Sequence, residues 1–257
     1  MRFFQPFSRV STSSSRAILA VWATLVLGLW ALQPLALIPN PVEVLQAFGS
    51  LFMGGGQTPV IIPDLAASMT LNVQAILIST VFSLTIAYLS ALPAFKPLAQ
   101  ATSKLRYLGL TGLTFLFGLL VSGYNLKLAL LVFGMSTFYV TSMVNVIQEI
   151  PLDNIRHALS LRMNPWRAWL EVIVFGTFDS ALEILRQNAA VGLIMLTTVE
   201  LLAQSDGGLG IVLRNVNRSF RMEDVFAVQF LILFIGLGQD YFFGWLRSLL
   251  CPYADKA

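Results

Sequence analysis

Residues 126–147 read LKLALLVFGMSTFYVTSMVNVI, a mostly apolar run that is long enough to cross a lipid bilayer as one helix. Crossing the ~30 Å hydrocarbon core takes about 20 predominantly apolar residues. Similar runs fall near 17–38, 68–95, 105–123, 178–203 and 225–249. Because lipid offers no hydrogen-bond partners, each run must be a helix or part of a closed barrel, and none alternates strictly as a barrel strand would. The sequence therefore predicts an all-α integral membrane protein with about six transmembrane helices.

The composition supports this class. The chain has 257 residues, of which 56% are hydrophobic and 11% charged, whereas soluble domains carry about 25% charged residues. We expect one membrane domain over 1–257, with no cleavable leader, because the first run extends past Trp30 into Pro34. The lone Cys251 excludes an intrachain disulfide, and the lone His157 is too little for a metal site or a membrane enzyme. We therefore expect no enzymatic activity, no metal and no nucleic-acid partner.

Lysines and arginines indicate the orientation, because they concentrate on the cytoplasmic side. If there are six spans, the following lysines and arginines all fall on the same side of the membrane: Arg2, Arg9, Arg16, Lys96, Lys104, Arg106, Arg156, Arg162, Arg167, Arg247 and Lys256. Both termini are then cytoplasmic, with a tail over 1–16. The exception is the predicted external loop 205–224, which holds Arg214, Arg218 and Arg221 beside Asp206, Glu223 and Asp224. That loop is either a salt-bridged, solvated segment or a surface that meets a partner or an anion.

The segment 39–64 is predicted to lie outside. Pro39-Asn40-Pro41 breaks the chain, and apolar residues then recur at helical spacing. They are Val42, Leu45, Phe48, Leu51 and Phe52. This pattern predicts an amphipathic helix on the outer membrane surface, ended by Gly54-Gly55-Gly56.

The segment 149–177 is a polar excursion between two apolar runs and is expected to form two short cytoplasmic helices. Asp153 is a candidate cap for the first helix, which should end near Arg162. Asn164 followed by Pro165 predicts the start of the second, with Trp166 and Trp169 on one side. An amphipathic hairpin on anionic lipid would explain the same pattern.

The run 149–164, EIPLDNIRHALSLRMN, resembles the cytoplasmic EAA loop of ABC importer permeases, in particular those of the nitrate, sulfonate and taurine type. Further motifs stand in that family's order: 38–44 (IPNPVEV), 185–186 (LR) with 199–202 (VELL), 208–210 (GLG), and Gly238 with Asp240 before Pro252-Tyr253. The resemblance extends over nearly the whole chain.

The resemblance implies a permease fold of the type I, MetI-like importers in the bacterial inner membrane. Its partners would be a second permease copy, two cytoplasmic ATPases that bind ATP and Mg²⁺, a periplasmic solute-binding protein, and lipid. The chain itself would need no cofactor. The ATPases would grip the coupling loop through Arg156, His157, Ala158, Leu161, Arg162, Asn164, Trp166, Arg167 and Trp169.

The chain also departs from the family pattern. Arg156-His157-Ala158 stands in place of Glu-Ala-Ala, and Arg162 in place of the Gly at the bend. Since Gly there would permit a positive φ, the bend must either move to Met163-Asn164 or be made differently. Asn164 is the candidate substitute, because Asn tolerates a left-handed conformation.

Polar residues within the runs are candidates for a translocation pathway, because polar groups in spanning helices tend to face the bundle interior. The candidates are Thr111, Thr114, Ser122, Tyr124, Asn125, Ser136, Thr137, Asn188, Thr197 and Thr198. The alternative is that these groups bond to their own or a neighbouring helix. Gly109, Gly112, Gly118, Gly134 and Gly192 are more simply explained as packing points.

Charges in the last two runs are expected to be structural. Glu183 and Arg186 are spaced to pair on one helix face, with Asp179 a turn earlier. Glu200 lies near the outer end of the same run, and Asp240 lies inside the last, where it needs a partner.

The sequence does not identify the solute. A small anion such as nitrate, bicarbonate, a sulfonate or a taurine-like compound is the expectation, with a vitamin precursor as the alternative. The main rival is a secondary transporter or channel, which would carry paired ionisable residues at mid-membrane or an inverted repeat of broken helices.

Overall fold

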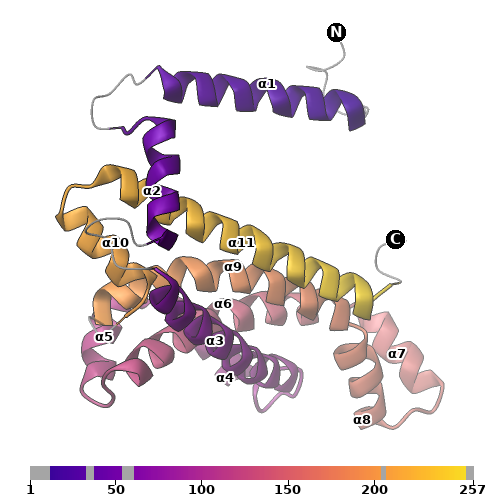
Figure 1. Cartoon of the computed structure of the whole chain (residues 1–257). Coiled ribbons are helices and arrows are strands. Elements are labelled where there is room, and N and C mark those ends of the chain that lie inside the picture. The colour runs from indigo at the N-terminus through magenta and orange to yellow at the C-terminus, as the bar shows by residue number, and fades with distance from the viewer. Residues whose placement is uncertain (1–11, 33–37, 54–60, 204–206, 253–257) are drawn as a thin grey trace. The chain divides into compact units, whose positions relative to one another are not determined.

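The structure is a computed structural model that describes residues 12–32, 38–53, 61–203 and 207–252. Throughout these residues every regular element is a helix. The helices are α1 (Thr12–Ala31), α2 (Pro41–Met53), α3 (Ile62–Leu89), α4 (Lys96–Lys104), the 3₁₀ helix η1 (Leu105–Tyr107), α5 (Leu110–Gly118), α6 (Tyr124–Gln148), α7 (Leu152–Ser160), α8 (Pro165–Ala168), the π-helix η2 (Trp169–Phe175), α9 (Phe178–Ala203), α10 (Leu209–Arg218) and α11 (Met222–Leu250) (Figure 1). The all-α prediction is confirmed for the described residues.

Four helices are long and apolar enough to cross a membrane. They are α1 over Ser14–Ala31, then α3, α6 and α11. The helix α9 has 26 residues, about 39 Å at 1.5 Å per residue, but it carries four charged residues, more than α1, α3 or α6 and as many as the longer α11. The chain is thus a membrane protein with four clear spanning candidates among its described residues.

The third predicted span, 105–123, is not one continuous helix. Leu108 and Gly109 are extended, with ψ of 124° and 133°, and they separate η1 from α5. The helix α5 has only 9 residues, so it is about 14 Å long, less than half of the ~30 Å core. The apolar composition of this run was readable from the sequence, but the break at Gly109 was not.

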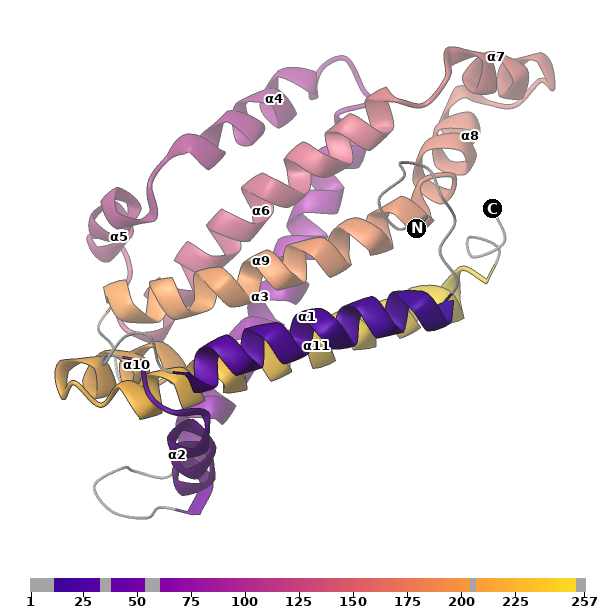
Figure 2. The same ribbon diagram turned by 90° about the horizontal axis from the view of Figure 1, so that it is seen from above.

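Contacts divide the chain into two compact units, Met1–Val60 with Val216–Gln229, and Ile61–Asn215 with Phe230–Ala257. In the second unit α6 is central and packs against α3, α9, α4 and α5 (Figure 2). One core cluster includes Leu71, Leu130 and Leu196, and another includes Tyr139 and Met143. These clusters fix the positions of α3, α6 and α9 relative to one another.

In the first unit, α2 forms as predicted, through a capping box. The Asn40 side chain accepts a hydrogen bond from the Val42 N–H (3.2 Å), and Glu43 accepts one from the Asn40 N–H (3.0 Å). Pro41 opens the helix, where its missing N–H is not needed. The predicted apolar face is only partly right, because the buried residues of α2 are Val44, Ala47 and Leu51, whereas Val42, Leu45 and Phe52 are exposed.

The predicted external loop 205–224 is largely helical. The helix α10 occupies half of it, and Phe220 then takes a left-handed φ of 54° before α11 begins. Arg221 pairs with the buried Asp224, which agrees with the salt-bridged alternative for that residue. Several residues of the sequence argument lie outside the described residues: Arg2, Arg9, Gly54, Gly55, Gly56, Asp206, Tyr253 and Lys256.

Candidate functional site

The segment between α6 and α9 forms a helical hairpin at one end of the second unit. It comprises α7, α8 and η2, and it lies at the opposite end of α6 from α5 (Figure 2). Its first helix ends at Ser160, close to the expected position. Asp153 does not cap this helix. Pro151 is the N-cap residue, and Asp153 lies in the first turn, where its carboxylate meets Arg156 at 3.4 Å.

The bend of the hairpin is made by Arg162 itself, which has a φ of 57°. The Arg162 N–H donates to the Leu159 carbonyl (3.0 Å), and the Met163 N–H donates to the Ala158 carbonyl (3.4 Å). These two bonds form a Schellman motif, which satisfies carbonyls that the helix end would leave unpaired. Asn164 has a φ of −60°, so the idea that it substitutes for the glycine is wrong. Asn164 instead caps α8, accepting from the Trp166 N–H at 3.2 Å, as predicted.

The predicted coupling residues separate into exposed and packed groups. Trp166 is 62% exposed, and Leu161 is similarly exposed. Ala158 is buried. Trp169 is half-buried: its Nε1 donates to the Tyr88 carbonyl (3.3 Å), and its ring meets the edge of Trp166 at 6.1 Å between centroids. Trp169 is therefore a packing residue that holds the hairpin to the end of α3.

Four exposed apolar residues of α7, of the bend and of α8 define what we term the hairpin surface. They are Leu152, Leu159, Leu161 and Trp166. Arg156, His157, Arg162 and Arg167 are exposed around them. Two of these charges already have partners, since Arg156 pairs with Asp153 and Arg167 donates to Glu171 at 2.6 Å. The hydrogen bond to Glu171 raises the pKa of the Arg167 guanidinium. The hairpin surface thus offers apolar contact area with a basic rim.

The π-helix η2 joins the hairpin to α9. The Gly176 N–H donates to the Glu171 carbonyl, five residues earlier, at 3.1 Å. A Cβ on Gly176 would lie 2.2 Å from the Val172 oxygen, so only glycine fits there without rearrangement. Such π-turns are rare and occur frequently at functional sites.

Four of the eight predicted pathway hydroxyls bond within their own helix. Thr114 donates to Leu110, Thr137 to Gly134, and Thr197 and Thr198 to Ile194. The structure therefore shows the local bonding that was the alternative explanation. The other candidates are scattered: Thr111, Ser122 and Asn125 are exposed, Tyr124 donates to Gln74 at 2.7 Å, and Ser136 and Asn188 are buried with no hydrogen-bond partner for their side-chain polar atoms.

Five charged residues of α9 and α11 form a ladder between these helices, which we term the charge ladder: Asp179, Glu183, Arg186, Asp240 and Arg247. Arg186 holds both carboxylate oxygens of Asp240, at 2.6 and 2.7 Å. Its predicted partner Glu183 is further away, at 3.8 Å. Asp240 thus has the partner that its position required.

Arg247 was missed as a member of this site, because it was counted only as an orientation charge. It contacts both oxygens of Asp179 (2.7 and 2.9 Å) and Glu183 (3.0 Å). A signal existed in the sequence. On α9 the acids Asp179 and Glu183 precede Arg186, and on α11 Asp240 precedes Arg247, and each set lies on one helix face. With the same order on both helices, opposite charges meet when the helices run antiparallel.

Glu200 occupies a second polar network, at the other end of α9. Its buried carboxylate accepts from the Ser68 hydroxyl (2.5 Å) and the Gly210 N–H (2.7 Å). The Ser68 oxygen in turn accepts from the Leu209 N–H at 2.9 Å. Gly208 has a φ of 121°, and a Cβ there would lie 2.5 Å from Glu200 Oε1.

Two more side chains hold the same turn. Asp64 accepts from the Gly208 N–H at 2.8 Å, and the buried Lys127 donates to the Gly207 carbonyl at 2.8 Å. We term Asp64, Ser68, Lys127 and Glu200 the turn clasp. It explains Glu200 as a structural charge, and the sequence argument missed its other three members because they belong to distant helices.

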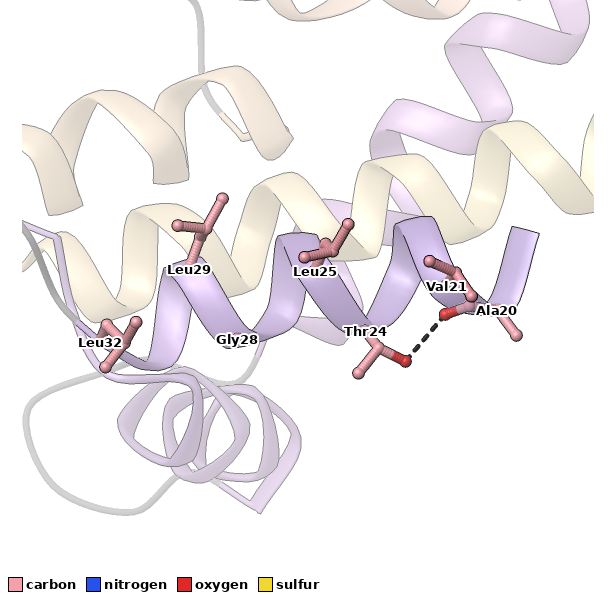
Figure 3. A pocket seen from close by; sticks show the side chains of 7 residues that line it. All are labelled: Ala20, Val21, Thr24, Leu25, Gly28, Leu29 and Leu32. Carbon is pink, nitrogen blue, oxygen red and sulfur yellow. Dashed lines mark hydrogen bonds between the residues drawn. The ribbon is translucent and has the colours of Figure 1, made fainter. Parts of the chain in front are cut away.

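The hollow on α1 and the metal-ligating side chains do not indicate a further functional site among the described residues. The hollow in Figure 3 is lined by residues of α1 and by Leu32, which directly follows it, and Thr24 there donates to the carbonyl of Ala20 at 2.8 Å. Within the described residues no group of three or more His, Cys, Asp or Glu side chains is placed to hold a metal ion. Cys251 is buried.

Comparison of the chain with protein-family models and with curated proteins finds no match.

Proposed function

We propose that the chain is the transmembrane permease subunit of an ATP-driven ABC importer in a bacterial inner membrane. The observation that carries this proposal is the exposed hairpin between α6 and α9, with its left-handed bend at Arg162 and its protruding Trp166. Large exposed aromatic and arginine side chains are typical anchors of protein interfaces. The sequence resemblance of residues 149–164 points to the same partner, a cytoplasmic ATPase.

In this proposal two permease copies form the pathway, in the MetI-like importer fold with about six spans and cytoplasmic termini. Two ATPases hold ATP and Mg²⁺ and contact the hairpin surface. A periplasmic binding protein delivers a small, anionic solute. Movement of the hairpin would pass through η2 into α9, and from α9 through the charge ladder into α11, shifting the population between two packings of the helices.

Reconstitution tests this proposal. The chain and the ATPase that copurifies with it would be placed in liposomes with the binding protein, and ATP hydrolysis measured after addition of nitrate, bicarbonate, sulfonates or taurine. We expect one of these solutes to stimulate hydrolysis. Failure of any ATPase to copurify would overturn the assignment, whereas hydrolysis unchanged by every solute would overturn only the choice of anions. An ATPase and a binding protein encoded beside the gene would be the quickest support.

Variants of the two tryptophans separate docking from folding. Trp166→Ala removes an exposed ring and should leave the protein inserted while abolishing coupled transport. Arg167→Glu should act similarly. Trp169→Ala should instead destabilise the hairpin, since it removes the hydrogen bond to Tyr88. Transport retained in both the Trp166 and the Arg167 variants would contradict the docking role.

One observation favours the rival, a secondary transporter. Asp240 lies in the middle part of α11 and pairs with Arg186 of α9, and paired ionisable residues at mid-membrane are typical of ion-coupled carriers. That function predicts uptake driven by an imposed proton gradient without ATP, and loss of this uptake in Asp240→Asn.

A further inference from the structure

We propose that the face of α9 and α11 that carries Arg186 and Asp240 borders water within the membrane domain, as one wall of an aqueous cavity. The inference requires only that α11 crosses the membrane, so it holds whether ATP or an ion gradient drives transport. It assigns a water-accessible wall to residues that were not among the predicted pathway candidates, including Arg186 and Asp240, which were expected to be structural charges.

The position of Asp240 along α11 is the first step. The helix runs from Met222 to Leu250, so its midpoint falls at Gly236. Asp240 lies four residues beyond this midpoint, which is about 6 Å along the axis. For a spanning α11 that is centred on the bilayer, Asp240 and the side chain of Arg186 that it holds then lie within the hydrocarbon core rather than at its edge.

Exposure is the second step. The side chains of Arg186 and Asp240 are 34% and 45% exposed, although they hold each other at 2.6 Å. Ionised groups in spanning helices almost always face a bundle interior or a water-filled cavity, because contact with lipid removes their hydration. An ion pair with these exposed fractions within the hydrocarbon core therefore requires hydration by adjacent water.

The charge balance is the third step. The charge ladder sets the carboxylates of Asp179, Glu183 and Asp240 against the guanidinium groups of Arg186 and Arg247. With all of these groups ionised, one negative charge is left uncompensated within the ladder. Hydrocarbon would not solvate this charge, whereas water would.

The surface is also hollowed at this point. A pocket of about 470 Å³ opens beside the ion pair, and its lining residues recur along one face of α11. They are Arg186 from α9 together with Leu237, Asp240, Tyr241, Gly244, Trp245 and Ser248. The opposite groove on α11 is lined mainly by apolar side chains such as Phe242 and Leu246 from α11 and Leu77 from α3. The helix thus presents one polar hollow and one apolar groove.

Two neighbouring residues allow a matched test. Tyr241 lines the polar hollow and is 78% exposed, whereas Phe242 lines the apolar groove and is 52% exposed. In a background with Cys251→Ala, single cysteines at each position would be treated with a charged, membrane-impermeant methanethiosulfonate in proteoliposomes of the full chain. Only the thiolate form of cysteine reacts with this reagent. Apolar surroundings raise the pKa of the thiol, and each rise of about one pH unit lowers the thiolate fraction, and with it the labelling rate, about tenfold.

We expect Tyr241→Cys to react at least about tenfold faster than Phe242→Cys, because water and hydroxide reach only the first. Equal, slow labelling of both would overturn the proposal and place the hollow against lipid. Slow labelling of Tyr241→Cys together with an oxidised, disulfide-linked dimer would also overturn it, since a second copy would then cover this face. Ser248→Cys provides a second reporter if Tyr241→Cys does not insert.

Discussion

At the scale of single residues, Arg162 is the clearest case of local strain. A left-handed conformation costs a non-glycine residue about 1–2 kcal/mol, and the Schellman bonds at this helix end hold Arg162 there.

Arg162→Gly should therefore raise the unfolding temperature measured in detergent, despite the greater freedom of glycine in the unfolded chain. Its stabilisation should be at most about 1 kcal/mol. The neighbouring Leu161, which has a φ of −78°, provides the control. Leu161→Gly should lower the unfolding temperature, and an equal loss in both variants would contradict the argument.

Ser68 is the second residue whose role can be tested alone. It donates to Glu200 and accepts from the Leu209 N–H, so Ser68→Ala leaves two buried polar groups without their partner. We expect a loss of about 1–3 kcal/mol in the free energy of unfolding. Ser79 is the matched control, because it is equally buried on the same helix but bonds only to its own helix carbonyl, of Ile76. Ser79→Ala should change stability much less, and a similar loss in both would argue against the turn clasp.

At the scale of elements, η2 depends on one glycine. Gly176→Ala would bring its Cβ within 2.2 Å of the Val172 oxygen, so the π-turn must rearrange. We expect lower stability and an altered hairpin, measured by the protease sensitivity of residues 149–177. Gly112→Ala is the control, because nothing lies within 4 Å of its Cβ and it sits inside α5. That change should stabilise the helix by up to about 1 kcal/mol. Unchanged protease sensitivity in Gly176→Ala would show that the π-turn is dispensable.

At the scale of the whole molecule, the charge ladder joins helices that are far apart in sequence. Asp179 and Arg247 are 68 residues apart and make two hydrogen bonds. Asp179→Arg and Arg247→Asp should each destabilise the protein, while the double variant should recover part of the loss, because the pair is restored with exchanged charges. A double-mutant cycle of unfolding temperatures in detergent would measure a coupling of about 0.5–3 kcal/mol. Additive losses would show that the pair contributes nothing to the packing of α9 on α11.

The sequence predicted features that depend on neighbours along the chain. Asn164 and Pro165 start α8 as predicted, because capping needs only adjacent residues, and a helix follows the predicted chain break at 39–41. Sequence-based prediction failed where residues far apart in the chain determine the local conformation. The left-handed φ of Arg162 depends on how the hairpin closes, and Trp169 is packed because Tyr88, 81 residues away, accepts its hydrogen bond. Likewise, the sequence places Arg247 on one helix face with Asp240, but its partners Asp179 and Glu183 are evident only with α9 and α11 side by side.

The turn clasp also bears on how the protein is made. Chains are synthesised from the N-terminus, so Ser68 and Lys127 enter the membrane before the Glu200 carboxylate exists. The helix α9, which carries more charge than α3 or α6, therefore emerges beside ready-made partners for its acidic end. We therefore expect the helices that are already in the bilayer to assist the insertion of α9, and a ribosome-bound intermediate lacking α3 should release α9 into the aqueous space.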